Sequence, residues 1–190
     1  MRRPRSRFSS SRKKLSADPN WRLRRASITD AAALSLVAGA SFLEAFAGVL
    51  DGADIVAHVA TNSSVGAFEH HSADPGCVAV LAECSAGAAP IGYTLLMPPD
   101  LPVDIGQDDI ELKRIYTLAT HYGAGLGAAL MQRAFDDARK LAKRRILLGV
   151  YGGNRRAHRF YEKHGFIVVG ARRFLVGQTW HDDRIYARAV

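Results

Sequence analysis

Short apolar runs separated by turns dominate the chain from residue 77 onward. The runs CVAVLAEC and PIGYTLLMP are joined by the small residues SAGAA and predict a β-hairpin. Strand-like and helix-like patterns then alternate, with strands expected at 111–118, 144–151, 166–177 and 182–190 and helices at 125–143 and 155–164. Strands joined first by a turn and later by helices predict an α/β (α+β) fold, a mixed sheet with helices on both faces.

The amino-terminal half predicts a strand followed by helices. WRLRRAS at 21–27 has the character of a strand, and Asp30 is expected to cap a helix that runs to about Val37. Apolar residues within 40–64 recur at helical spacings, at Phe42, Phe46, Val49 and Leu50. These positions predict one or two further amphipathic helices before the hairpin.

Positive charge is concentrated at the amino terminus. Residues 1–25 hold ten of the 26 Arg and Lys residues and one acidic residue, Asp18, so this segment carries +9 in a chain of net charge +8. Its Ser- and Arg-rich sequence has too little apolar surface to offset the entropy of ordering it. We therefore expect a disordered basic arm over 1–20 and a single, nearly neutral domain over 21–190.

Several classes of protein find little support in the sequence. No apolar run has the length of a signal-peptide core or approaches the length needed to span a bilayer, so we expect a cytoplasmic protein without a membrane partner. Cys77 and Cys84 fit neither a disulfide framework nor a closely spaced metal pair, and we expect both to be reduced. His181 precedes Asp182 and Asp183, but adjacent residues on a strand point apart, so no metal site is expected.

A glycine-rich turn stands between the strand at 111–118 and the helix that follows it. Gly123, Gly125 and Gly127 have no side chains that would block a ligand, and the first amides of the helix are free, which favours an anion site. The spacing differs from a mononucleotide P-loop, which needs a Lys and a Ser or Thr, and from the dinucleotide pattern G-x-G-x-x-G. A hydride-transferring enzyme is therefore the weaker hypothesis.

Residues 154–166, NRRAHRFYEKHGF, predict a short helix with Asn154 as its N-cap and Gly165 as its stop. With the glycine turn and the intervening strand, the pattern N-x-x-A-x-x-F-Y-x-x-x-G-F resembles the GNAT superfamily of N-acetyltransferases over about residues 114–166. The resemblance implies a GNAT-like, mostly antiparallel sheet of about six or seven strands. Two neighbouring strands of that sheet are expected to splay apart at the acetyl-CoA site.

The resemblance also implies which residues bind acetyl-CoA. In the family the turn reads Gln/Arg-x-x-Gly-x-Gly/Ala, so Tyr122 stands where Gln or Arg is usual. The family turn binds mainly through backbone amides, and the preceding strand binds the pantetheine arm. The implied cosubstrate site, which has no metal, consists of Tyr116, Thr117, Leu118, Tyr122, Gly123, Ala124, Gly125, Leu126, Gly127, Ala128, Asn154, Ala157 and Tyr161.

The mechanism implied by the resemblance is direct attack of a neutral primary amine on the thioester in a ternary complex. Leu118 is expected to offer its amide to the thioester oxygen. Tyr161 matches the Tyr that protonates the leaving thiolate, since the pKa of a phenol is ~10 and that of a thiol is ~8.5. Glu111 shares a strand face with Lys113 and is the best placed carboxylate for the amine proton. A solvated charge at the strand edge explains Glu111 equally well.

The amine acceptor has no motif of its own. Glu44 and the run Trp180–Asp183 are expected to form an anionic wall that selects a cationic amine, and VGQTWHDD faintly resembles polyamine acetyltransferases. A small molecule such as a polyamine and a protein amino group both stay open, as does a homodimer, which is common in the superfamily. The alternatives are a noncatalytic CoA-binding regulatory domain and a nucleic-acid-binding protein that acts through the basic arm.

Overall fold

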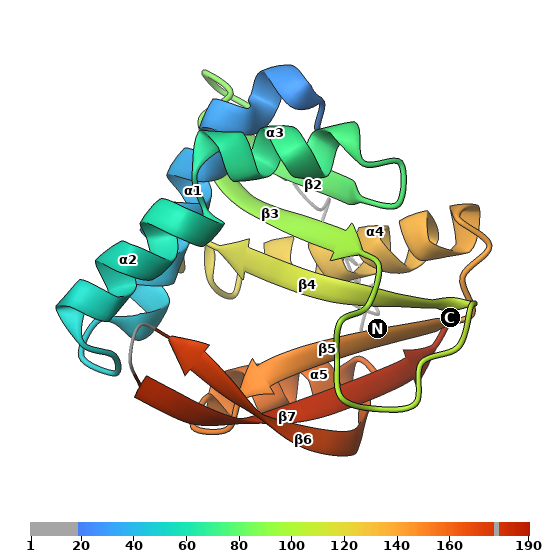
Figure 1. Cartoon of the computed structure of the whole chain (residues 1–190). Coiled ribbons are helices and arrows are strands. Elements are labelled where there is room, and N and C mark those ends of the chain that lie inside the picture. The colour runs from blue at the N-terminus through green and yellow to red at the C-terminus, as the bar shows by residue number, and fades with distance from the viewer. Residues whose placement is uncertain (1–18, 177–178) are drawn as a thin grey trace, which may run out of the picture.

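A computed structural model describes residues 19–176 and 179–190, which contain a seven-stranded sheet in the order β1-β2-β3-β4-β5-β7-β6 (Figure 1). Every neighbouring pair is antiparallel except β4 and β5. The predicted mixed, mostly antiparallel sheet is thus confirmed. The strands are β1 (Trp21–Arg25), β2 (Val78–Cys84), β3 (Pro90–Met97), β4 (Asp109–Thr117), β5 (Arg145–Tyr151), β6 (Ile167–Val176) and β7 (Thr179–Ala189).

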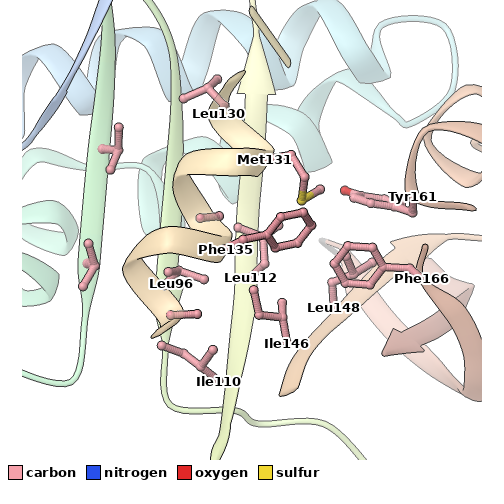
Figure 2. Packing of buried hydrophobic residues seen from close by; sticks show 14 of the residues in the cluster. Leu96, Ile110, Leu112, Leu130, Met131, Phe135, Ile146, Leu148, Tyr161 and Phe166 are labelled. Atoms are coloured by element: carbon pink, nitrogen blue, oxygen red, sulfur yellow. The ribbon is translucent and has the colours of Figure 1, made fainter. Parts of the chain in front are cut away.

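Helices cover both faces of the sheet, because successive strand residues point to opposite sides. In β2, Val78 and Val80 pack in the cluster beneath α4 and α5, whereas Ala79 and Leu81 pack in the cluster beneath α1 and α3. Figure 2 shows part of the first cluster, in which Phe135 of α4 lies near Phe166. The helices are α1 (Ala31–Phe46), α2 (Gly52–Asn62), α3 (Val65–Ala73), α4 (Leu126–Lys140) and α5 (Arg155–Lys163), with 3₁₀ turns η1 (Ile28–Asp30) and η2 (Ala119–His121).

The hairpin and all the later strands and helices are confirmed, but the amino-terminal half differs from expectation. Helix α1 continues past Val37 to Phe46, because most of its side chains are small or apolar, no proline interrupts them, and its single glycine, Gly39, is tolerated within the helix. Asp30 does not cap α1 with its side chain. Its carboxylate instead accepts hydrogen bonds from Arg24 at 2.6 and 2.8 Å and from the Ser27 amide at 2.8 Å. Helix α3 was not expected at all. Phe68 is its one buried residue, so the sequence of α3 shows no repeat of apolar residues at helical spacing.

Residues 1–18 of the expected basic arm lie outside the described residues. The stretch Ile28–Phe46 is long and apolar enough, by length and composition alone, to cross a membrane, with a mean hydropathy of 1.3. The expectation that no segment approaches this length was therefore wrong. A helix that covers a sheet passes the same test, and Leu34 and Val37 of α1 are buried in the cluster that contains β2 and β3 residues.

The parallel strands β4 and β5 separate along their length. They pair only where Asp109–Glu111 meets Arg145–Leu147. Beyond this point β4 continues against β3 and β5 continues against β7. A register shift between Leu95 and Leu96 of β3 marks a bulge against β4, and a bulge bends and twists the strands that carry it. Figure 1 shows β4 and β5 starting together and diverging toward the end where α2 lies, which confirms the predicted splayed pair.

Candidate active site

A cavity of about 280 Å³ occupies the gap between β4 and β5. This volume lies close to the lower end of the range for small-molecule sites, about 300–1,000 Å³. Its walls come from both faces of the sheet, and we name the two parts by their helices. The α5 half is lined by Tyr122, Gly127, Asn154, Arg156, Ala157, Phe160 and Tyr161, and the α2 half by Phe42, Phe46, Leu50, His58, Asn62, Arg114, Tyr151, Arg172, Phe174, His181 and Asp183.

The glycine turn leads into the α5 half. Gly123 and Gly125 have φ values of 79° and 81°, in the left-handed region that favours glycine, and a Cβ at either would meet no described atom within 4 Å. The backbone therefore requires glycine while the space above it stays open. The first helical bond of α4 runs from the Ala129 amide to the Gly125 carbonyl, at 3.0 Å. The three amides before it are available to an anion.

Tyr122, which replaces the usual Gln or Arg of the turn, carries a cation on its ring. The Arg156 guanidinium carbon lies 3.2 Å from the Tyr122 ring centroid, and both side chains line the cavity. Such stacking is a cation–π contact. Sequence reasoning missed Arg156 because the family pattern N-x-x-A accepts any residue at its position. The structure thus places beside the turn the positive charge that the turn itself lacks.

Hydrogen bonds fix the start of α5 against the cavity. The Asn154 Oδ1 accepts from the Ala157 amide at 3.0 Å, which confirms the expected N-cap. The buried His158 bonds the Tyr186 hydroxyl of β7 and the Gly152 carbonyl, each at 2.9 Å. Sequence reasoning missed His158, because nothing in its local pattern reveals a partner 28 residues away.

Tyr161 lines the cavity and is 9% exposed. Its ring lies 5.6 Å from that of Phe160 and 5.8 Å from that of Phe166, and Figure 2 shows its hydroxyl directed toward Met131 of α4. Burial raises the pKa of Tyr161 above its ordinary value of 10. The phenol therefore keeps its proton at neutral pH and can donate it to an anion formed in the cavity.

The amide of Leu118 is not free. It donates to the Ile91 carbonyl of β3 at 2.9 Å, and Leu118 does not line the cavity, so the expectation that this amide faces a thioester oxygen was wrong. Alternate residues of a strand direct their backbone groups to opposite edges. Ile115 and Thr117 therefore turn their amides toward the gap, and both line the cavity together with Tyr116.

The remaining expected cosubstrate residues divide into two groups. Gly127, Asn154 and Ala157 line the cavity, and their contact with a cosubstrate stays a prediction. The turn and first helical residues Gly123, Ala124, Gly125, Leu126 and Ala128 do not line it. The Leu126 side chain is fully buried in the core, so it offers a ligand only its backbone.

Glu111 lies at the closed end of the gap, at the last point where β4 pairs with β5. It is 1% exposed, so the alternative of a solvated charge at the strand edge was wrong. One carboxylate oxygen lies 3.1 Å from the Lys113 Nζ, and the other accepts from the Asp100 amide at 3.0 Å. Its role as a base stays a prediction.

Aromatic and imidazole rings form much of the α2 half. Phe42 stacks on His58 at 4.3 Å with an interplanar angle of 10°, and the Phe46 ring lies 4.5 Å from that of Phe42. On the opposite wall, Tyr151 meets His181 edge to face at 5.5 Å. Burial, and then the charge of Arg114, lowers the pKa of His58 to about 4, so this imidazole is neutral at pH 7.

The expected anionic wall is only partly present. Glu44 does not line the cavity, because its carboxylate accepts a hydrogen bond from the Ala119 amide at 2.7 Å. Alternation along β7 brings His181 and Asp183 into the cavity and leaves Trp180 outside it, 55% exposed. Burial raises the pKa of Asp183 above its ordinary value, and the nearby Arg172 opposes this shift. The α2 half therefore combines both signs of charge.

No group of three or more His, Cys, Asp or Glu residues in the part of the chain that the structure describes could hold a metal ion. Both cysteines are free thiols, as expected. Burial raises the pKa of Cys77 to about 11, so this thiol stays protonated at neutral pH.

Known proteins share both the sequence pattern and the fold. The model of the Acetyltransferase (GNAT) family matches residues 46–166, more than half of the chain. An uncharacterized N-acetyltransferase of Mycobacterium tuberculosis is 33% identical over 163 residues, which span 86% of this chain and 99% of that protein. The fold is similar to that of the PaiA N-acetyltransferase from Thermoplasma acidophilum in complex with coenzyme A, with a TM-score of 0.74 and 22% identity over 90% of this chain and 99% of that one. It is also similar to the putative acetyltransferase YncA from Salmonella typhimurium with acetyl-CoA, with a TM-score of 0.63 and 20% identity over 90% of this chain and 94% of that one. The chain therefore belongs to the GNAT family of acetyltransferases and is an N-acetyltransferase.

Proposed function

We propose that this N-acetyltransferase takes an acetyl group from acetyl-CoA and transfers it to a primary amine by direct attack in a ternary complex. The cavity in the gap between β4 and β5 carries the proposal, because it joins a glycine turn and a buried tyrosine on one face of the sheet to a second chamber on the other face. Two proteins of similar fold hold coenzyme A or acetyl-CoA, which supports the same donor here.

The residues of the α5 half and of β4 suit this donor. The open amides at the start of α4, with Arg156 beside them, would hold the pyrophosphate. A backbone without side chains at Gly123 and Gly125 lets the phosphates approach closely. The edge of β4 that faces the gap, at Ile115 and Thr117, would bind the pantetheine arm through its unpaired backbone groups. Bound acetyl-CoA supplies an activated acyl carbon.

Transfer forms a bond from the amine nitrogen to the acyl carbon and breaks the bond from that carbon to sulfur. A β4 amide that faces the gap, at Ile115 or Thr117, is suited to stabilise the developing oxyanion, an effect worth about 3 kcal/mol. Sulfur leaves as a thiolate and takes the phenolic proton of Tyr161. Glu111, at the closed end of the gap, is the proposed acceptor of the amine proton.

Steady-state release of CoA with acetyl-CoA and a panel of primary amines tests the proposal. Direct transfer predicts intersecting double-reciprocal lines when both substrates are varied, whereas an acyl-enzyme intermediate predicts parallel lines. If the protein binds acetyl-CoA but no amine raises the rate of CoA release, the proposed reaction is wrong.

A further inference from the structure

We infer that the acceptor is a zwitterionic amine, a small molecule with a carboxylate close to its amino group, as in a free amino acid. The inference rests on the proposed function, because it names the chemical class of amine that the α2 half of the cavity binds. Its basis is that Arg172 and Asp183 lie side by side in that half, and that Gly149 leaves room for the Arg172 guanidinium.

Arg172 and Asp183 form a loose ion pair inside the cavity. They stand opposite each other in the register of β6 and β7, and their side chains are only 13% and 6% exposed. The Nε and Nη2 of Arg172 both donate to the same oxygen of Asp183, each at 3.3 Å. The two groups thus share one carboxylate oxygen, which leaves hydrogen-bonding capacity on both for a ligand.

Other Arg–carboxylate pairs of the sheet are tighter and satisfy each other. Arg24 donates to both oxygens of Asp30, at 2.8 and 2.6 Å. Arg145 likewise contacts both oxygens of Asp109. None of these four residues lines the cavity. These two pairs outside the cavity thus have the bidentate geometry that is strongest for an Arg–carboxylate pair, whereas the pair of Arg172 and Asp183 inside the cavity does not.

The sheet is shaped to hold the Arg172 guanidinium beside the gap. A Cβ on Gly149 of β5 would lie 2.7 Å from the Arg172 Nη2 and 3.0 Å from its Cζ, so any larger residue there would displace the guanidinium. An isolated glycine within a strand commonly marks such a close approach. Gly149 lies on the part of β5 that has separated from β4, so the Arg172 guanidinium above it lines the cavity between these strands.

A zwitterion matches this arrangement better than a simple amine does. Its carboxylate would bind the free edge of Arg172, and its ammonium would pair with Asp183. Once the ammonium has lost a proton to Glu111, the proposed base, the neutral amine would donate a hydrogen bond to Asp183 while its lone pair attacks the acyl carbon. A polyamine has no carboxylate to pair with Arg172 or Arg114, so its own positive charges would be repelled by these two side chains. Arg114 also lines this half, where one nitrogen donates to the Asn62 carbonyl at 2.6 Å and the buried Nη1 has no hydrogen-bond partner among the described residues.

The apolar part of the α2 half indicates the rest of the acceptor. Phe42, Phe46 and Leu50 line it, and His58 presents a neutral ring. These walls suit an apolar or aromatic side chain, because burial of such a group is favourable without further polar partners. Free amino acids with apolar side chains are therefore the acceptors to test first.

CoA release with matched acceptors tests the inference. The acceptors are free amino acids with apolar or aromatic side chains, the carboxamides of the same amino acids, and the corresponding decarboxylated amines. We expect kcat/KM for an amino acid to exceed that for its carboxamide by about tenfold or more. Arg172→Gln should reduce this ratio to less than about threefold. Arg173→Gln, which removes a neighbouring exposed arginine outside the cavity, should preserve it.

Three results would overturn the inference. They are equal rates with amino acids and carboxamides, a preference for the carboxylate that survives Arg172→Gln, and no acetylation of any amino acid by a protein that binds acetyl-CoA. Calorimetric titration of acetyl-CoA, together with CoA release with the decarboxylated amines, distinguishes these results from failure of the proposed function, in which either acetyl-CoA does not bind or no primary amine raises the rate of CoA release. If Arg172→Gln does not fold, Arg172→Lys keeps the charge but loses the planar fork, and should lower the preference by about threefold or more.

Discussion

The two halves of the cavity are assembled in different ways. The α5 half comes from one continuous stretch of chain, in which the glycine turn, α4, β5 and α5 follow one another within residues 122–161. The α2 half combines residues 42–62 with Arg114 and with residues 151–183, which meet only in the folded protein. A site built from one stretch of chain can be read from a local sequence pattern, whereas a site built from distant segments depends on how the whole chain folds.

If the two halves have separate tasks, Tyr161→Phe should produce the largest fall in the rate of acetyl transfer while acetyl-CoA still binds. Removal of the proton donor should lower kcat about 100-fold. The acetyl-CoA dissociation constant should stay within about threefold, because the ring that packs in the core is retained. Steady-state kinetics and calorimetry measure the two quantities. An unchanged kcat would contradict the assignment of Tyr161 as the acid.

Gly149→Ala should have the next largest effect and should act on the acceptor alone. The added Cβ displaces the Arg172 guanidinium, so kcat/KM for the acceptor should fall about tenfold while acetyl-CoA affinity is retained. Gly66→Ala in α3 is the matched control, since a Cβ there meets no described atom within 4 Å and Gly66 lies outside the cavity. Equal losses of donor and acceptor affinity would show that the halves are not separable.

Arg156→Gln should weaken donor binding by a smaller factor. Loss of one exposed cation beside the pyrophosphate should raise KM for acetyl-CoA about fivefold. The same variant should leave KM unchanged for S-acetylpantetheine, which has no phosphates. Arg155→Gln, one residue earlier on α5 and outside the cavity, is the control. An equal rise in KM for both donors would refute a phosphate contact.

Protonation of His58 should lower the stability of the folded protein below neutral pH. Burial lowers its pKa from 6.5 to about 4 in the folded state, so between these values the unfolded chain binds the proton more readily. The stabilising contribution of neutral His58 is present above pH 6.5 and is lost as the pH falls toward 4. From pH 7 to pH 5, the Tm of the wild type should therefore fall about 3 °C more than that of His58→Gln. Parallel curves for the two proteins would show that His58 titrates normally.

The sequence predicts the α5 half well and the α2 half poorly, for physical reasons. Asn154 and Tyr161 occupy positions whose local geometry is set by a cap and a helix face, and the turn that leads into this half needs the left-handed Gly125; each of these features has a sequence signal. The expectation for Leu118 failed because a shift of one residue along a strand reverses the direction of the amide. The positions of Arg172 over Gly149 and of His58 on Phe42 depend on strand order and helix packing, which no short pattern encodes.

Calorimetric titration of acetyl-CoA into the wild type and into Arg172→Gln tests the division of the cavity most directly. We expect one site per chain with about micromolar affinity in the wild type. Arg172→Gln should bind the donor equally well, because the guanidinium belongs to the acceptor half. No binding by the wild type, or a loss of donor affinity in Arg172→Gln, would contradict the assignment of acetyl-CoA to the α5 half and of the amine to the α2 half.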